Sequence, residues 1–420
     1  MAFKHRFEAD AVSAMNSLRA LRLNSRLVRS SILVLVLVSV VLFVSSSPQP
    51  AVGSDGKASG YSQAVKSSIS QLFDKPNPYE TKVTEARLAR QFPFDKTPRP
   101  IEKNIWQMWK VKPSDPDFPQ KDFVNQWKND NPTYNYNFLT DDEILAHLRL
   151  QLKDTVPEVL EAFEMLPTKI LKSDFSRYLM VYLNGGLYSD ADTQLYKPVD
   201  QWFDSNKNVG FVVGIEEDIN AENWENYMTR RIQFEQWTLK AKARHPLLRK
   251  LIARITKVTF DAQKRGHLVA YYKDFKGVDK CKSVNIMEWT GPVIWTDTIY
   301  DYLNSLTNPT VVEIDPERTY KPEDELYGPE IGPGENFNWK FFAGVKAPIM
   351  IDDVVIYPRL SFRDDISNNC GKYCYVFHWF GGSWKNNGKG EVKPGDEKKE
   401  ENKKDDEKKE KRDEGCLGSY

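Results

Sequence analysis

A Gly-Gly break followed by two aspartates one residue apart is the feature that most constrains the fold of this chain. The stretch GGLYSDAD, residues 185–192, ends a long apolar run and places Asp190 and Asp192 directly after a short strand pattern. Side chains at positions i and i+2 of a strand project from the same face, so the two carboxylates are expected side by side. Carboxylates this close repel each other unless a cation lies between them. The pattern therefore predicts a cation-binding pair at the carboxyl end of a strand.

The run before the break predicts a buried helix. In PTKILKSDFSRYLMVYLN, residues 167–184, Asp174 and Arg177 are three residues apart and lie on one helical edge. Apolar side chains cover much of the remaining circumference, which indicates packing against a sheet. A buried Asp–Arg pair needs further partners, such as the hydroxyls of a ligand; the alternative is a surface salt bridge. Gly185 and Gly186 follow, at a helix end where positive φ is common.

Strand and helix patterns alternate around this block. KNIWQMW and YNYNFLT, residues 103–109 and 134–140, are typical of strands, and DDEILAHLRLQL, residues 141–152, is typical of a helix that begins with acidic residues. This order predicts an α/β layer structure whose parallel strands present their carboxyl ends to a ligand.

The aspartate pair favours a hard divalent cation. Oxygen ligands suit Mn²⁺ or Mg²⁺, and either ion can bind a diphosphate at the same time. Cys370, Cys374 and His378 also have the spacing of zinc ligands on a helix, but YCYVFHWF predicts a strand, which would spread them apart. A structural zinc site is therefore not favoured. The four cysteines are too few for a disulfide scaffold, although one bridge is possible in an oxidising compartment.

The chain ends differ in composition from the middle. Residues 30–47, SSILVLVLVSVVLFVSSS, carry no charge and would span ~27 Å as a helix, enough for a thin bilayer. Four arginines between residues 19 and 29 predict a cytoplasmic tail over residues 1–29 and a transmembrane signal anchor over residues 30–47, with the rest of the chain in the lumen. The alternative is a cleaved signal peptide, with residues 32–44 as its apolar region.

Residues 48–100 mix Ser, Pro and short helical patterns, which is typical of a stem. Residues 386–420 form a tract of mixed charge that is expected to be disordered. The 59 basic and 59 acidic residues balance, so nothing in the composition indicates a nucleic-acid partner.

The order D-x-x-R, helix, G-G-x-Y and D-x-D resembles the sugar-transfer core of the fungal initiation-specific, outer-chain α-1,6-mannosyltransferase family. The resemblance covers residues 101–385 and includes NIWQMWK, VVGIEED, RRIQFEQWTLKAKARHPLL, EWTGPVIWTD and VFHWFGGSWK. It implies a GT-A-type nucleotide-diphospho-sugar transferase fold, with a Rossmann-like mixed sheet and one preceding transmembrane helix. It also implies a single-pass type II protein of the Golgi membrane with a luminal catalytic domain.

The resemblance implies roles for individual residues. Asp190 and Asp192 would mark the metal and diphosphate site, and His378 would complete the metal shell; its alternative role is core packing. The substrate-binding residues would be Asp174 and Arg177 on sugar hydroxyls, Tyr188 near the nucleoside, Trp109 stacked on the base, and Arg230 and Arg231 on phosphate or acceptor. The alternatives are a core position for Trp109 and a solvated helix start for the two arginines.

The resemblance further implies transfer of mannose from GDP-mannose, with Mn²⁺ or Mg²⁺, to the N-glycan core of glycoproteins, with retention at the anomeric carbon. Retention can proceed by same-face attack, which we favour, or through a covalent intermediate on a carboxylate. Glu216, Glu217 and Asp297 are the candidates for that carboxylate. The alternative functions are a non-catalytic or paralogous subunit in a complex with other mannosyltransferases that polymerises mannan, and an inositol phosphoceramide mannosyltransferase.

Overall fold

The computed structural model describes the central part of the chain: residues 80–202, 208–221, 223–271, 282–313, 336–362 and 371–380. The expected cytoplasmic tail, the membrane anchor at residues 30–47, most of the stem and the charged tail lie outside the described residues. None of the helices within the described ranges has the length and apolar character that a membrane span requires.

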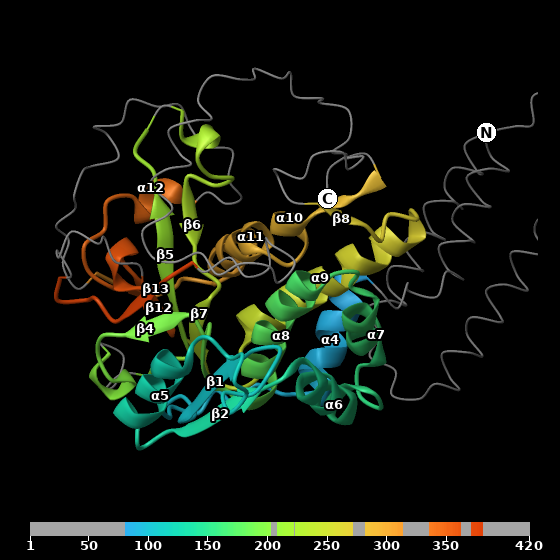
Figure 1. Ribbon diagram of the computed structural model, residues 1–420. Coiled ribbons are helices and arrows are strands. Elements are labelled where there is room, and N and C mark those ends of the chain that lie inside the picture. The colour runs from blue at the N-terminus through green and yellow to red at the C-terminus, as the bar shows by residue number, and fades with distance from the viewer. Residues whose placement is uncertain are drawn as a thin grey trace, which may run out of the picture. The chain divides into compact units, whose positions relative to one another are not determined.

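A mixed sheet positions the functional residues (Figure 1). Within the described residues it has nine strands, in the order β10, β11, β12, β5, β7, β3, β1, β2, with β6 paired to β5. Their bounds are β1 Asn104–Met108, β2 Asn135–Leu139, β3 Gly186–Ser189, β5 Phe211–Asp218, β6 Ile232–Phe234, β7 Thr238–Ala241, β10 Val311–Glu313, β11 Ile349–Ile351 and β12 Val354–Tyr357. The strands predicted at residues 103–109 and 134–140 are confirmed as β1 and β2.

The sheet is parallel only in part. Strand β1 is parallel to both β2 and β3, and β12 is parallel to β5. Strand β7 lies between β3 and β5 and is antiparallel to both. The parallel β2–β1–β3 portion therefore gives the carboxyl-terminal edge that the alternating pattern predicted, and β7 brings a different segment of chain to that edge. Two short ribbons complete the strands: β4 Thr193–Leu195 with β13 Val376–His378, and β8 Ala270–Tyr271 with β9 Val284–Asn285.

Helices pack around the sheet. Their bounds are α4 Thr81–Gln91, α5 Lys121–Asp130, α6 Asp141–Leu152, α7 Pro157–Met165, α8 Lys169–Asn184, α9 Pro246–Lys264, α10 Ile286–Trp289, α11 Pro292–Asn304 and α12 Trp339–Phe342. Helix α9 contacts α4, α7, α8 and α11, and these helices lie together in Figure 1. Helix α4 falls in the segment assigned to the stem, yet Leu88 on it is wholly buried, because α4 packs its apolar side against α9. Residues 81–91 therefore belong to the folded unit.

Helix α8 confirms the prediction of a buried helix before the Gly-Gly break. Asp174 and Arg177 are 2% and 5% exposed, so their pair is not a surface salt bridge. The helix ends at Gly185, where φ is +67°, and Gly186 follows with φ of +103°. A Cβ on Gly186 would lie 2.4 Å from the carbonyl oxygen of Asn104, so only glycine lets β3 pair with β1 so soon after the helix.

Candidate active site

The two aspartates of the D-x-D motif lie in a turn between β3 and β4. Strand β3 ends at Ser189, so the expectation of two strand positions on one face is wrong; the turn brings the carboxylates together instead. Its backbone is held from three sides. The Asp190 N–H donates to the Trp237 carbonyl at 2.9 Å, and the Asp190 carbonyl accepts from Gln107 Nε2 at 3.1 Å and from Thr193 Oγ1 at 2.6 Å. The carboxylates therefore project from a fixed loop.

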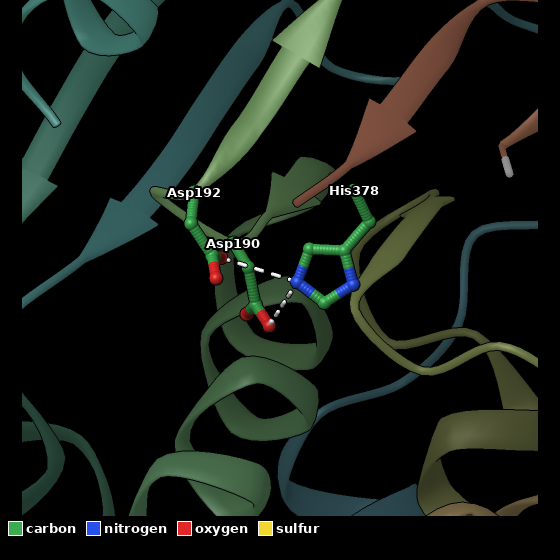
Figure 2. Close-up of side chains that lie close together, drawn as sticks. All are labelled: Asp190, Asp192 and His378. Atoms are coloured by element: carbon green, nitrogen blue, oxygen red, sulfur yellow. Dashed lines mark hydrogen bonds and ion pairs between the residues drawn. The ribbon is translucent and has the colours of Figure 1, made fainter. Parts of the chain in front are cut away.

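His378 completes a cluster with the two aspartates (Figure 2). It comes from β13, which pairs with β4 so that His378 lies opposite Thr193. Its Nε2 is 3.1 Å from Asp192 Oδ1 and 3.9 Å from Asp190 Oδ2. The structure thus brings together the three residues that the sequence analysis assigned to the metal.

Aromatic packing orients the His378 ring. The ring stacks on Trp237 with 4.5 Å between centroids and lies 4.1 Å from the Phe380 ring. Its Nδ1 is buried and has no hydrogen-bond partner among the residues that the structure describes. His378 is therefore both a packed aromatic residue and a potential ligand, because Nε2 alone faces the carboxylates.

The charges at the cluster act on His378. Burial lowers the pKa of the imidazole, but the negative charges of Asp192 and Asp190 outweigh burial, and the pKa is raised above its ordinary value. The same negative potential would attract a divalent cation to this place. The cluster therefore has the electrostatics of a cation site.

The donor set of the cluster fits a divalent metal ion. Asp190, Asp192 and His378 each offer one ligand atom, and these atoms lie within 4.8 Å of one another. Two carboxylate oxygens and one imidazole nitrogen are compatible with a first-row divalent ion, with further positions for a substrate. Cys374 is disulfide-bonded and so is not a ligand for the zinc site considered above; Cys370 lies outside the described residues.

Arg177 connects the metal-ligand candidates to α8. Its Nη2 is 3.3 Å from Asp174 Oδ1 and 3.4 Å from Asp190 Oδ1. Tyr188 donates its hydroxyl to the same Asp190 oxygen at 2.5 Å, and its ring lies 5.5 Å beneath the guanidinium. Asp190 therefore uses Oδ1 for protein contacts, while Oδ2 is the oxygen nearer to His378.

Asp174 is enclosed by residues that the sequence analysis missed. Thr290 Oγ1 donates to Asp174 Oδ2 at 3.0 Å, and Gln236 Nε2 is 3.4 Å from Oδ1. Tyr178 holds both of these residues, since its hydroxyl contacts Gln236 Oε1 and the Thr290 carbonyl. Burial raises the pKa of Asp174 to about 6, against the opposing effect of Arg177. The partners that the buried pair was expected to need are supplied by the protein.

The missed residues lie in two segments that the sequence analysis had already singled out. Gln236 and Trp237 belong to RRIQFEQW, and Thr290 belongs to EWTGP. Their side chains meet at Asp174 and His378 only because β7 and α11 pack beside α8, which is long-range information. In the sequence, these residues could be found only as members of RRIQFEQW and EWTGP, two of the segments that carry the family resemblance.

The three candidate carboxylates differ in their surroundings. Glu217 pairs with Arg359 at 2.9 Å, and Asp297 makes a two-point pair with Arg230 at 2.8 Å. Glu216 accepts from Gln233 Nε2 at 2.7 Å and has no cationic partner within the described part of the chain. The β5–β6 register shifts between Ile215 and Glu217, so Glu216 occupies a bulge. After burial and the two aspartates, its charge also acts to raise the pKa of His378.

The remaining predicted residues lie at different depths. Trp109 follows β1, packs edge-on against Phe118 at 6.0 Å between centroids, and belongs to the same cluster as Ala191 of the D-x-D loop. Arg231 is wholly buried with its guanidinium 3.9 Å over the Trp339 ring. Arg230 and Arg231 directly precede β6, so the alternative of a solvated helix start is wrong. The binding roles assigned to these residues stay predictions.

A fixed D-x-D loop at the edge of a mixed α/β sheet, with a histidine facing both carboxylates, defines a glycosyltransferase-like protein. Residues 118–209 match the family model described as "Glycosyltransferase sugar-binding region containing DXD motif".

Three curated proteins refine this class. The chain is 36% identical over 326 residues to the initiation-specific alpha-1,6-mannosyltransferase of Candida albicans, and the alignment covers 73% of this chain and 78% of that protein. It is 30% identical over 392 residues to the protein of the same name from Saccharomyces cerevisiae, covering 72% and 81%. It is 32% identical over 328 residues to the putative glycosyltransferase HOC1 of the same yeast, covering 76% and 74%. The chain belongs to the initiation-specific α-1,6-mannosyltransferase family.

Proposed function

We propose that this protein transfers mannose from GDP-mannose, in α-1,6 linkage and with retention, to the N-glycan core of glycoproteins, and so initiates the outer chain. One observation carries the proposal: Asp190, Asp192 and His378 converge at the end of β3 in a chain similar to α-1,6-mannosyltransferases. We also propose a single-pass type II location in the Golgi membrane, which rests on residues 30–47 and the arginines before them.

Asp190, Asp192 and His378 would hold Mn²⁺, or Mg²⁺ in its place. When bound, such an ion supplies charge neutralisation for the diphosphate of the leaving nucleotide. The chain's own residues make this arrangement ready in advance: Arg177 and Tyr188 fix one oxygen of Asp190, and Trp237 fixes the His378 ring. Groups held in place before substrate arrives need little reorganisation during the reaction.

Glu216 is the carboxylate that we assign to the sugar side of the reaction. Its two rivals are neutralised by Arg359 and Arg230, whereas Glu216 is oriented by a neutral amide and its charge reaches the cluster. In a same-face attack, which we favour, Glu216 would stabilise the positive charge that develops on the mannose ring. The acceptor oxygen then forms the new bond on the face from which the phosphate departs, and a phosphate oxygen takes its proton.

The test is an assay of the full-length protein in detergent with GDP-mannose and a high-mannose oligosaccharide acceptor. We expect transfer that requires added Mn²⁺, is abolished by a chelator, and gives a product whose new linkage is α-1,6 by methylation analysis. Transfer that persists in excess chelator would contradict the metal assignment. A product with another linkage, or mannose transfer to inositol phosphoceramide instead, would contradict the acceptor assignment.

A further inference from the structure

Four aromatic side chains form a partly exposed strip beside the candidate active site. We call Tyr196, Phe377, Trp379 and Phe123 the aromatic strip. Trp379 stacks on Phe123 of α5 with 5.9 Å between centroids and 19° between ring planes. Phe377 packs edge-on against Trp379 at 5.1 Å and lies 6.5 Å from Tyr196. The strip thus joins three separate parts of the chain: α5, the residue after β4, and β13 with its extension.

The strip is open to solvent. Trp379 is 39% exposed and Tyr196 is 41% exposed. Large aromatic side chains gathered at a surface are unusual without a ligand, because their burial elsewhere would be favourable. Their common exposure at one place therefore indicates a binding surface.

The strip is continuous with the candidate active site. The Trp379 N–H donates to the Asp192 carbonyl at 3.1 Å, so the strip and the D-x-D loop share a backbone hydrogen bond. Phe377 and His378 are neighbours in β13, and side chains alternate along a strand, so the Phe377 ring lies on the opposite face of β13 from the imidazole. On α5, Val124 next to Phe123 belongs to the same buried hydrophobic cluster as Ala191 of the D-x-D loop.

We propose that the aromatic strip binds the acceptor glycan, one or more saccharide rings away from the reacting mannose. A pyranose ring has an apolar face of C–H bonds, whose hydrogens pack favourably on the negative face of an aromatic ring. A nucleotide is usually enclosed by its site, whereas a glycan that remains attached to a glycoprotein must enter along an open surface. An open row of rings fits the second kind of ligand.

This inference rests on the proposed function and names where its acceptor binds. The test compares Trp379→Ala with wild type in the full-length protein, using GDP-mannose and a high-mannose oligosaccharide. We expect the KM for the oligosaccharide to rise about tenfold, since a central aromatic contact is commonly worth that much in binding. The KM for GDP-mannose and the affinity for GDP with Mn²⁺ are expected to stay unchanged.

Three further variants make the result specific. Phe123→Ala removes the ring beneath Trp379 from another element and is expected to raise the same KM by a smaller factor. Trp379→Phe keeps an aromatic face and is expected to restore most of the affinity. Leu150→Ala, at a position on α6 that is 81% exposed, is the control for loss of a surface apolar side chain and is expected to change nothing.

An unchanged acceptor KM in both alanine variants would overturn the inference and leave the proposed function intact. A raised KM for GDP-mannose alone would assign the strip to the nucleobase and overturn it too, as would a change of oligomeric state, which would mark the strip as an interface. Saturation-transfer NMR measures binding of the oligosaccharide independently of turnover. If wild type transfers nothing, the proposed function fails, but oligosaccharide binding that Trp379→Ala abolishes and Asp190→Asn retains would still support the strip.

Discussion

The three aspartates of the candidate active site lie in two different environments. Asp190 and Asp192 have side chains 21% and 14% exposed, and both face His378. Asp174 is 2% exposed and has Thr290, Gln236 and Arg177 around both of its oxygens. We call Asp190 and Asp192 the metal-facing cluster, whose charge would bind a ligand. We call Asp174 with Thr290, Gln236 and Arg177 the buried network, which fixes the position of Asp190.

Aspartate thus serves two purposes within a few ångströms of the same site. Like charges held close together lower stability, and Arg177 and His378 compensate for this at Asp190 and Asp192. A buried ion pair whose partners are complete is costly to break from one side. Substitutions in the two groups should therefore separate activity from stability.

The largest effect is expected from removing the charges of the metal-facing cluster. In Asp190→Asn with Asp192→Asn, mannose transfer should fall about a thousandfold or more, because the leaving nucleotide loses its electrostatic support. Unfolding in urea should show a smaller loss of stability than Arg177→Ala causes, because Arg177 keeps Asp174 as a partner, and calorimetry should show lost Mn²⁺ binding. Asp200→Asn, at a half-exposed aspartate paired with Lys103, is the control. Undiminished Mn²⁺ binding in the double variant would contradict the assignment of Asp190 and Asp192 to the metal.

Arg177→Ala is expected to have the next largest effect, and on stability. It leaves Asp174 and Asp190 without their shared cation, and breaking a buried pair from one side costs about 3–5 kcal/mol of unfolding free energy. Arg177→Lys keeps the charge but lacks the guanidinium that contacts both Asp174 and Asp190, so it should recover only part of this loss. Arg254→Ala removes an arginine that is 28% exposed in its pair with Asp301 and should cost no more than about 1 kcal/mol. Urea unfolding of the three variants measures these losses of unfolding free energy. Equal losses for Arg177→Ala and Arg254→Ala would contradict a stabilising role for the buried network.

Glu216→Gln tests whether the carboxylate in the β5 bulge contributes to catalysis. Transfer should fall about a hundredfold in kcat, as is usual when one preorganised electrostatic group is lost, while GDP affinity stays constant. The matched control is Glu217→Gln, one residue along β5, whose charge is paired with Arg359 and should contribute nothing to kcat. A larger loss in Glu217→Gln than in Glu216→Gln would reverse the assignment.

The smallest effect is expected from Thr290→Val, which removes one donor from the buried network. An oxygen of Asp174 is left unsatisfied in the interior, at a cost of about 1–3 kcal/mol. Thr298→Val on α11 is the control, because that hydroxyl donates to the carbonyl of Ile294 in its own helix and its loss should cost less. Comparable unfolding free energies for the two variants would show that Asp174 does not depend on Thr290.

Local patterns in the sequence predicted the framework of this site well. The helix with Asp174 and Arg177, the Gly-Gly break and the strand before Asp190 follow from apolar periodicity and backbone sterics over neighbouring residues. The candidate metal ligands Asp190 and Asp192 followed from the same stretch. These features depend on contacts close in sequence, which periodicity encodes.

The surroundings of the site could not be predicted in the same way. Thr290 follows α10, and Gln236 and Trp237 precede the antiparallel β7. Nothing in the local pattern fixes the order of strands in a mixed sheet. The burial of α4 is another example, since an amphipathic helix does not reveal that α9 is its partner. The distinction between Glu216 and Glu217 required the bulge in β5 to be seen.

The last ligand of the cluster is separated from the first two by most of the domain. His378 meets Asp192 across 186 residues of chain. During synthesis on the ribosome, the D-x-D loop emerges long before β13, so the cluster cannot be assembled until translation is nearly complete. A chain cut short before β13 would keep the acidic loop but lack its histidine. Proteolytic clipping before β13 would thus remove His378 from the cluster while sparing most of the mass of the protein.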